Sequence, residues 1–123
     1  MSSEDKFVHA IALVESSDNP NIHLGDNGRA AGRFQQHPYF TYQWSPFGNR
    51  SIALTANERT AAHHNPTQDL VEELALRLFY RAAPPAKKVD DVAIAYHLHG
   101  YHIYNDGEDL EYRAKFNQEY AKL

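Results

Sequence analysis

Residues 13–36, LVESSDNPNIHLGDNGRAAGRFQQ, begin as the end of a helix and continue as a series of turns. The apolar stripe before this stretch recurs at helical spacing, which predicts a helix that ends at about Ser16. Ser, Asn, Asp, Pro and Gly, which break helices, crowd the residues that follow. Glu15 lies four residues after Ile11, so its carboxyl is expected on the apolar face at the last helical turn.

Two interpretations of Glu15 follow from this position. The negative end of the helix dipole and apolar neighbours both disfavour a charged carboxyl and raise its pKa. A glutamic acid that keeps its proton near neutral pH is what a general acid requires. Alternatively, Glu15 lies at the helix edge, solvated or bonded to nearby backbone amides. Position alone favours this second interpretation, because carboxylates near helix ends are mostly exposed.

The whole chain, residues 1–123, is predicted to be a single domain. Its length, with 42% hydrophobic and 12% aromatic residues, suits one compact core. We expect an α+β fold that is predominantly α, with one small β-hairpin. The hairpin would use NIHL (residues 21–24) as a strand and GDNG (residues 25–28) as its turn.

Helical patterns account for most of the remaining chain. The first helix is expected to be capped by Ser3, and a short one to cover about residues 30–39. A further short helix is predicted at about 52–62. The helix capped by Asn65 would carry leucines at positions 70, 74 and 78 and end at APPAKK (residues 83–88). Two more are expected, from Asp90 and Asp91 to Gly100, and across Tyr112, Phe116 and Tyr120.

Composition excludes several classes of function. The net charge is −4 with both signs interspersed, so no nucleic-acid partner is expected. No apolar run approaches the roughly 20 residues of a membrane span, and no membrane insertion is expected. There is no cysteine, which excludes disulfides and thiolate metal sites. Of the eight histidines, His97 and His99 would point about 200° apart on a helix. We therefore expect no metal site and no cofactor.

Four short motifs resemble the goose-type lysozyme and lytic transglycosylase superfamily. In that group a helix ends in Glu-Ser-Ser or Glu-Ser-Gly, a proline follows, and a Gly-x-x-Gln element comes later. Here these are Glu15-Ser16-Ser17, Pro20 and Gly32-Arg33-Phe34-Gln35. VAIAYHLHG (residues 92–100) is similar to the family's Ala-x-Ala-Tyr-Asn-x-Gly segment, and EYRAKF (residues 111–116) to its terminal helix.

The resemblance implies a lysozyme-like fold and a peptidoglycan glycosidase. Glu15 would protonate the β-1,4 glycosidic oxygen between N-acetylmuramic acid and N-acetylglucosamine. It would then act as base on water or on the sugar's own 6-hydroxyl. Asp26 is the candidate if a second carboxylate takes part, although an aspartate in Asp-Asn-Gly commonly serves a turn. A lysozyme-like module that binds glycan without cleaving it is the alternative.

The same resemblance suggests which residues contact the sugar. His97 stands where the family has Asn. Tyr39 belongs to an aromatic segment whose rings would either stack on sugars or fill the core. The substrate-binding candidates are Ser17, Gln35, Tyr39, Tyr96 and His97.

The expected partner is the glycan strand of peptidoglycan, and the protein is expected to be a monomer. Charged residues interrupt the first twenty positions, so no signal peptide is expected. The chain would be made in the cytoplasm and reach the cell wall after release or delivery, as a phage lysin, a virion-associated module or an effector.

Overall fold

The computed structural model describes residues 1–19, 30, 32–44, 66–99 and 107–123. These ranges are predominantly helical, as predicted, and contain no strand, only isolated bridge residues at Ala30 and Gln36. The predicted hairpin and the predicted helix at 52–62 lie outside the described residues. The helices are α1 (Ser3–Ser16), α2 (Pro38–Trp44), α4 (Pro66–Arg81), α5 (Val89–His99) and α6 (Leu110–Ala121).

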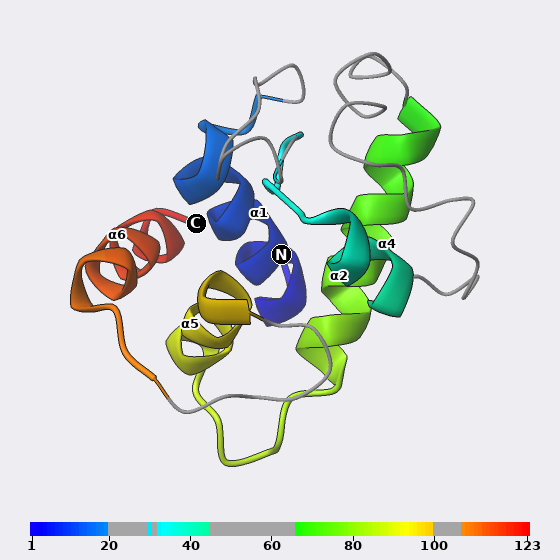
Figure 1. The fold of residues 1–123 in the computed structure, drawn as a ribbon. Helices are drawn as coiled ribbons and strands as arrows, with labels where there is room; N and C mark the ends of the chain where they lie inside the picture. The colour runs from blue at the N-terminus through cyan, green and yellow to red at the C-terminus, as the bar shows by residue number, and fades with distance from the viewer. Residues whose placement is uncertain (20–29, 31, 45–65, 100–106) are drawn as a thin grey trace.

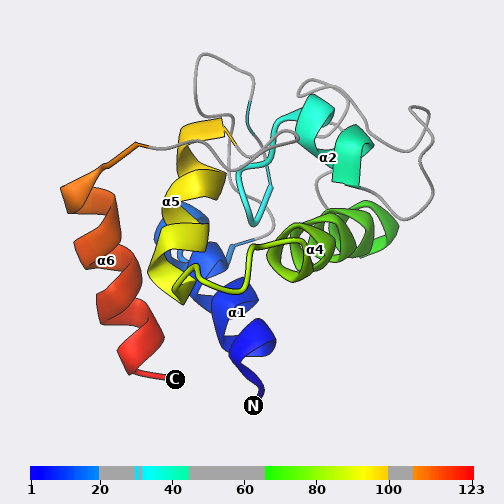
Figure 2. The same cartoon turned by 90° about the horizontal axis from the view of Figure 1, so that it is seen from below.

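Helix α1 is at the centre of the arrangement. It packs against α4, α5 and α6, while α2 packs on α4 and α5 on α6. Figure 1 shows α4 on one side of α1 and α6 on the other. Figure 2, turned by 90°, shows that both chain ends lie at the same end of the molecule. The C-terminal end of α1 therefore points away from the termini.

Helix α1 has clear boundaries at both ends. Ser2, one residue before the predicted cap, is the N-cap, and its hydroxyl accepts a 3.1 Å hydrogen bond from the Asp5 amide. The helix ends at Ser16, as predicted. Ser17 then adopts a left-handed conformation with φ 56°, and its amide donates to the Leu13 carbonyl. A C-terminal residue of this conformation satisfies carbonyls of the last turn and turns the chain sharply.

Aromatic and aliphatic side chains from every helix meet in one core. Tyr112 and Phe116 are buried on α6 at the predicted spacing. On α4, Leu70 of the leucine series that predicted this helix is 53% exposed. Val71, Ala75 and Phe79, which also recur every fourth residue, face the core instead. The fully buried large apolar side chains are Phe7, Ile11, Phe34, Leu76, Phe79 and Phe116.

The helix predicted at 30–39 is not formed. Residues 32–35 make a turn in which Gly32 has φ 81° and Gln35 has φ 49°. These values are incompatible with a continuing right-handed helix. Helix α2 begins only at Pro38, a residue suited to a first helical turn and one that disfavours helical backbone in the residue before it.

Arginines join α4 to α1. Arg77 donates to Glu4 at 2.9 Å and to Asp5 at 2.7 Å. Arg77 also lies 3.4 Å from Glu73, which precedes it by four residues on α4. These partly buried contacts fix the start of α1 along α4, so the far end of α1, which carries Glu15, is placed by the same packing.

Candidate active site

The last turn of α1 presents Glu15 to helix α6. The Tyr112 hydroxyl donates a 2.7 Å hydrogen bond to Glu15 Oε2, and Tyr112 itself is only 7% exposed. The two residues are 97 positions apart in the chain. The fold therefore brings together the first and last of the four motifs.

Burial raises the pKa of Glu15 to about 7, although the Tyr112 hydrogen bond acts in the opposite direction. Burial and the negative charge of Glu15 also raise the pKa of Tyr112 well above its usual value, so the phenol remains a donor. A carboxyl with a pKa near neutrality exists in both forms at physiological pH. Glu15 can therefore both give and take a proton, as acid–base catalysis requires.

An open pocket of about 300 Å³ lies beside the Glu15 carboxyl. Its wall is mostly polar and comes from the ends of α1 and α5, the start of α6 and the residue before it. Such a concave polar surface next to a perturbed acid is a candidate reaction site. The lining residues are Val14, Glu15, His97, Asp109, Glu111, Tyr112 and Lys115. Of the predicted site residues, this pocket gathers Glu15 and His97.

Tyr96 connects α5 to the turn at 32–35. Its hydroxyl donates a 2.6 Å hydrogen bond to the Phe34 carbonyl. Its ring meets Phe40 edge-on at 5.0 Å, so it also packs against the core. Tyr96 therefore packs against the core and holds the turn that contains Gln35. Its predicted contact with substrate stays a prediction.

Ser16, the neighbour of the predicted substrate-binding residue Ser17, joins the helix end to the same turn. The Ser16 hydroxyl donates to the Arg33 carbonyl at 2.6 Å and accepts from the Asn19 amide at 3.1 Å. Ser17 is exposed, and its hydroxyl bonds to none of the described residues. The sequence held a signal for this difference, because Ser16 lies four residues after buried Ala12.

The two neighbouring glutamines differ in environment. Gln35 is partly exposed, and its side-chain amide donates to the Gly32 carbonyl at 3.1 Å within its own turn. Gln36 is 1% exposed and donates to the Glu72 carbonyl at 2.7 Å. It also accepts from the Thr41 hydroxyl at 2.8 Å. The buried polar contact that supports this segment is thus made by Gln36, and not by the predicted substrate-binding residue Gln35.

The aromatic segment divides between core and surface. Phe40 is buried, and Trp44 packs edge-on against Phe79 at 5.3 Å. Tyr39 is 53% exposed, with the Tyr42 ring 6.5 Å away. Stacking of Tyr39 on a sugar remains a prediction. Asp26 lies outside the described residues.

Glu72 on α4 is a buried carboxyl, 2% exposed, that no motif in the sequence pointed to. It accepts a 3.1 Å hydrogen bond from Gln68 through Oε2. Its Oε1 lies 2.9 Å from where a Cβ on Gly32 would stand. The close approach explains why glycine suits position 32. In the described part of the chain, no three His, Asp or Glu side chains gather as a metal site.

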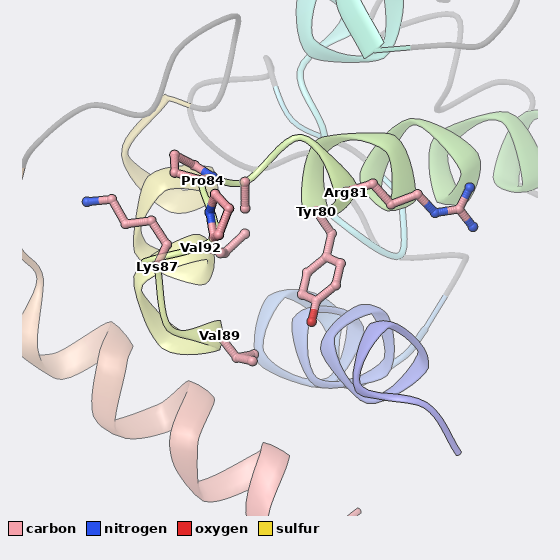
Figure 3. A pocket seen from close by; sticks show the side chains of 8 residues that line it. Tyr80, Arg81, Pro84, Lys87, Val89 and Val92 are labelled. Atoms are coloured by element: carbon pink, nitrogen blue, oxygen red, sulfur yellow. The ribbon is translucent and has the colours of Figure 1, made fainter.

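A second pocket, of about 240 Å³, lies where α4 ends and α5 begins. Figure 3 shows Pro84 beside Val92, with Tyr80 pointing to α1 and the charged ends of Arg81 and Lys87 directed away from the centre. None of its eight lining residues is a carboxylic acid. It therefore offers no acid for glycoside cleavage, and the pocket at Glu15 is the better candidate.

Comparison of the chain with protein-family models, with curated proteins and with solved structures found no match. Among the described helices, none has both the length and the apolar character needed to cross a bilayer.

Proposed function

We propose that the protein is a peptidoglycan-cleaving glycosidase with a lysozyme-like fold, in which Glu15 is the general acid and base. The observation that carries the proposal is the half-buried Glu15 carboxyl at a helix end, with a pKa of about 7, bonded to Tyr112 beside an open pocket. A second support is that Glu15 of the first motif and Tyr112 of the fourth motif are in direct contact.

The bond to be cleaved is the β-1,4 linkage between N-acetylmuramic acid and N-acetylglucosamine. Protonated Glu15 gives its proton to the glycosidic oxygen as the bond from the sugar's C1 to that oxygen breaks. The resulting carboxylate then takes a proton from water as the water oxygen bonds to C1, which gives hydrolysis. If it takes the proton from the substrate's 6-hydroxyl instead, that hydroxyl oxygen bonds to C1 and an anhydro-sugar forms. Tyr112 holds the carboxyl in place through both steps.

A second carboxylate would normally complete a glycosidase site. Two carboxylates line the pocket beside Glu15. Asp109 caps α6 and contacts His97, and Glu111 faces solvent beside Lys115. We therefore propose that the substrate's own N-acetyl group assists the reaction, with Asp26 as the candidate for a protein group.

The proposed setting is the bacterial cell wall. The protein would act as a monomer on glycan strands after release by a phage holin, on a virion, or as a delivered effector. Substrate contacts from Ser17, Gln35, Tyr39, Tyr96 and His97 form part of this proposal.

The test is clearing of a suspension of bacterial cell walls by the wild type and by Glu15→Gln. We expect the variant to lose at least a hundredfold in rate, because general acid catalysis typically contributes about 10²–10⁴-fold. Glu119→Gln, which removes a carboxylate farther along α6, is the matched control and should clear walls normally. Wild-type activity should fall as the pH rises above about 7, because Glu15 then loses its proton.

The alternative is a module that binds glycan without cleaving it. Wild type that sediments with cell walls but releases no fragments would establish this alternative and refute the enzyme proposal. If fragments are released, their masses separate the two reactions, because an anhydro product is lighter than a hydrolysis product by one water.

A further inference from the structure

Asp109 connects the end of α5 to the start of α6 through its two carboxylate oxygens. Oδ1 accepts a 3.0 Å hydrogen bond from the Tyr112 amide and so caps α6. Oδ2 lies 3.0 Å from His97 Nε2. The Tyr112 amide and His97 both lower the pKa of Asp109, which keeps it an acceptor. One carboxylate therefore fixes both the backbone at Tyr112 and the imidazole of His97.

The imidazole in turn covers the phenol ring of Tyr112. The two rings are stacked, with centroids 3.9 Å apart and planes inclined by 9°. A parallel contact at this distance restrains rotation of the phenol about its side-chain bonds. The hydroxyl at the end of that ring is the group that donates to Glu15.

We propose that His97 and Asp109 are a positioning pair, which aligns the Tyr112 hydroxyl on Glu15 and thereby sets the proton affinity of the acid. The pair acts through Tyr112 rather than by touching the reacting bond. Its catalytic meaning rests on the proposed function, but its effect on Glu15 does not, because that effect can be measured without substrate.

Every titratable or charged group at this pocket bears on the test. Helix α6 contributes Tyr112, Glu111 and Lys115. Helix α5 contributes His97, and its Tyr96 is among the groups that raise the pKa of Tyr112. The remaining acid is Asp109, just before α6. Loss of a negative charge near Glu15 lowers its pKa, whereas loss of a well-aligned hydrogen bond raises it. Removal of Asp109 therefore lowers the Glu15 pKa if only its charge matters, and raises it if Asp109 aligns the Tyr112 hydroxyl.

The experiment is NMR titration of the Glu15 side-chain carboxyl in protein labelled with ¹³C at glutamate. Asp109→Ser keeps a good helix cap but removes the acceptor for His97. We expect the Glu15 pKa to rise by about 0.5 to 1 unit, part of the value of a hydrogen bond to a charged group. Glu111→Gln, which removes a negative charge from the same pocket without touching His97, should give no rise.

A double-mutant cycle tests whether the effect passes through Tyr112. In a Tyr112→Phe background, Asp109→Ser should no longer raise the Glu15 pKa. His97→Ala, which leaves Asp109 to cap α6, is the second variant. It should also raise the Glu15 pKa when Tyr112 is present and leave it unchanged in the Tyr112→Phe background. A Glu15 pKa that falls or stays constant in Asp109→Ser, or that rises equally without the Tyr112 hydroxyl, would overturn the inference.

The two proposals can fail independently. If the titrations behave as expected but the wild type cleaves no cell wall, the positioning pair stands and the glycosidase proposal fails. If the wild type is active, Asp109→Ser should lose its activity at a higher pH than the wild type does, by the same amount as the titrated Glu15 pKa rises. An unmoved profile would show that the pair does not govern the catalytic proton.

Discussion

Replacement of Glu15 by Gln should stabilise the protein at high pH, even though it removes the proposed acid. In the unfolded chain the Glu15 pKa is expected near its ordinary 4.5, whereas burial raises it to about 7 in the folded protein. Between these values the folded protein holds a proton that the unfolded chain has released. The free energy of unfolding therefore falls as the pH rises through this window.

The size of the effect follows from the two pKa values. Each pKa unit corresponds to about 1.4 kcal/mol, so a rise from 4.5 to about 7 corresponds to about 3 kcal/mol. Below the lower value Glu15 is protonated in both states and contributes its full stability. Above the higher value that contribution is lost. Gln cannot ionise, keeps a similar shape and can still accept the Tyr112 hydrogen bond, so the variant avoids the loss.

Urea unfolding at about pH 4 and about pH 8 measures the difference for both proteins. We expect the variant to gain about 3 kcal/mol on the wild type between the two pH values, since all other titrating groups are shared. Glu111→Gln, whose side chain is 82% exposed, is the control and should change stability by no more than about 0.5 kcal/mol at either pH. A gain below about 1 kcal/mol for Glu15→Gln would refute the burial of its carboxyl.

Three further substitutions test the surroundings of the site. Tyr112→Phe should raise the Glu15 pKa by about 1 to 2 units, measured by NMR titration, because a hydrogen bond to the charged form is lost. Arg33→Met should cost about 1–3 kcal/mol in urea unfolding, since the partly buried guanidinium bonds three carboxylates. Gly32→Ala should cost about 1–3 kcal/mol in thermal or urea unfolding, because φ is 81° and the new Cβ would stand 2.9 Å from Glu72 Oε1.

Each of these has its own control. An unchanged Glu15 pKa in Tyr112→Phe would show that the phenol does not act on the acid. Arg81→Gln is the comparison for Arg33, because its side chain is 61% exposed, and an equal loss from both would contradict the role of burial. A Gly32→Ala protein as stable as the wild type would mean that the turn does not need its left-handed glycine.

The helices were predictable from the sequence where apolar residues recur at helical spacing and helix-breaking residues mark the helix end. Helix α1 ends at Ser16 as predicted, and α6 buries Tyr112 and Phe116 at the expected four-residue spacing. The segment after Ala30 was predicted wrongly as a helix. Local propensity could not show that Gln35 adopts φ 49°, a conformation supported by tertiary contacts around the turn.

The site was predictable only in part. Glu15 could be selected because its position on an apolar helix face coincided with the family's Glu-Ser-Ser motif, whereas its position alone favoured a solvated carboxylate. Its partner Tyr112 was assigned to the spacing of a core helix, since nothing in a sequence shows which buried phenol lies 2.7 Å from a given carboxyl. The link from Asp109 through His97 to Tyr112 depends on how α5 and α6 pack, which no local pattern encodes.

The contact between Glu15 and Tyr112 makes the acid dependent on the last helix described. Of the described helices α6 leaves the ribosome last, and until it packs against α1 the Glu15 side chain is without its phenol and much of its apolar cover. Its pKa would then return toward the ordinary value, and little of it would be protonated at neutral pH. Local unfolding of α6 in the folded protein would lower the Glu15 pKa in the same way. The proton that the proposed catalysis requires is thus available only while α1 and α6 remain packed together.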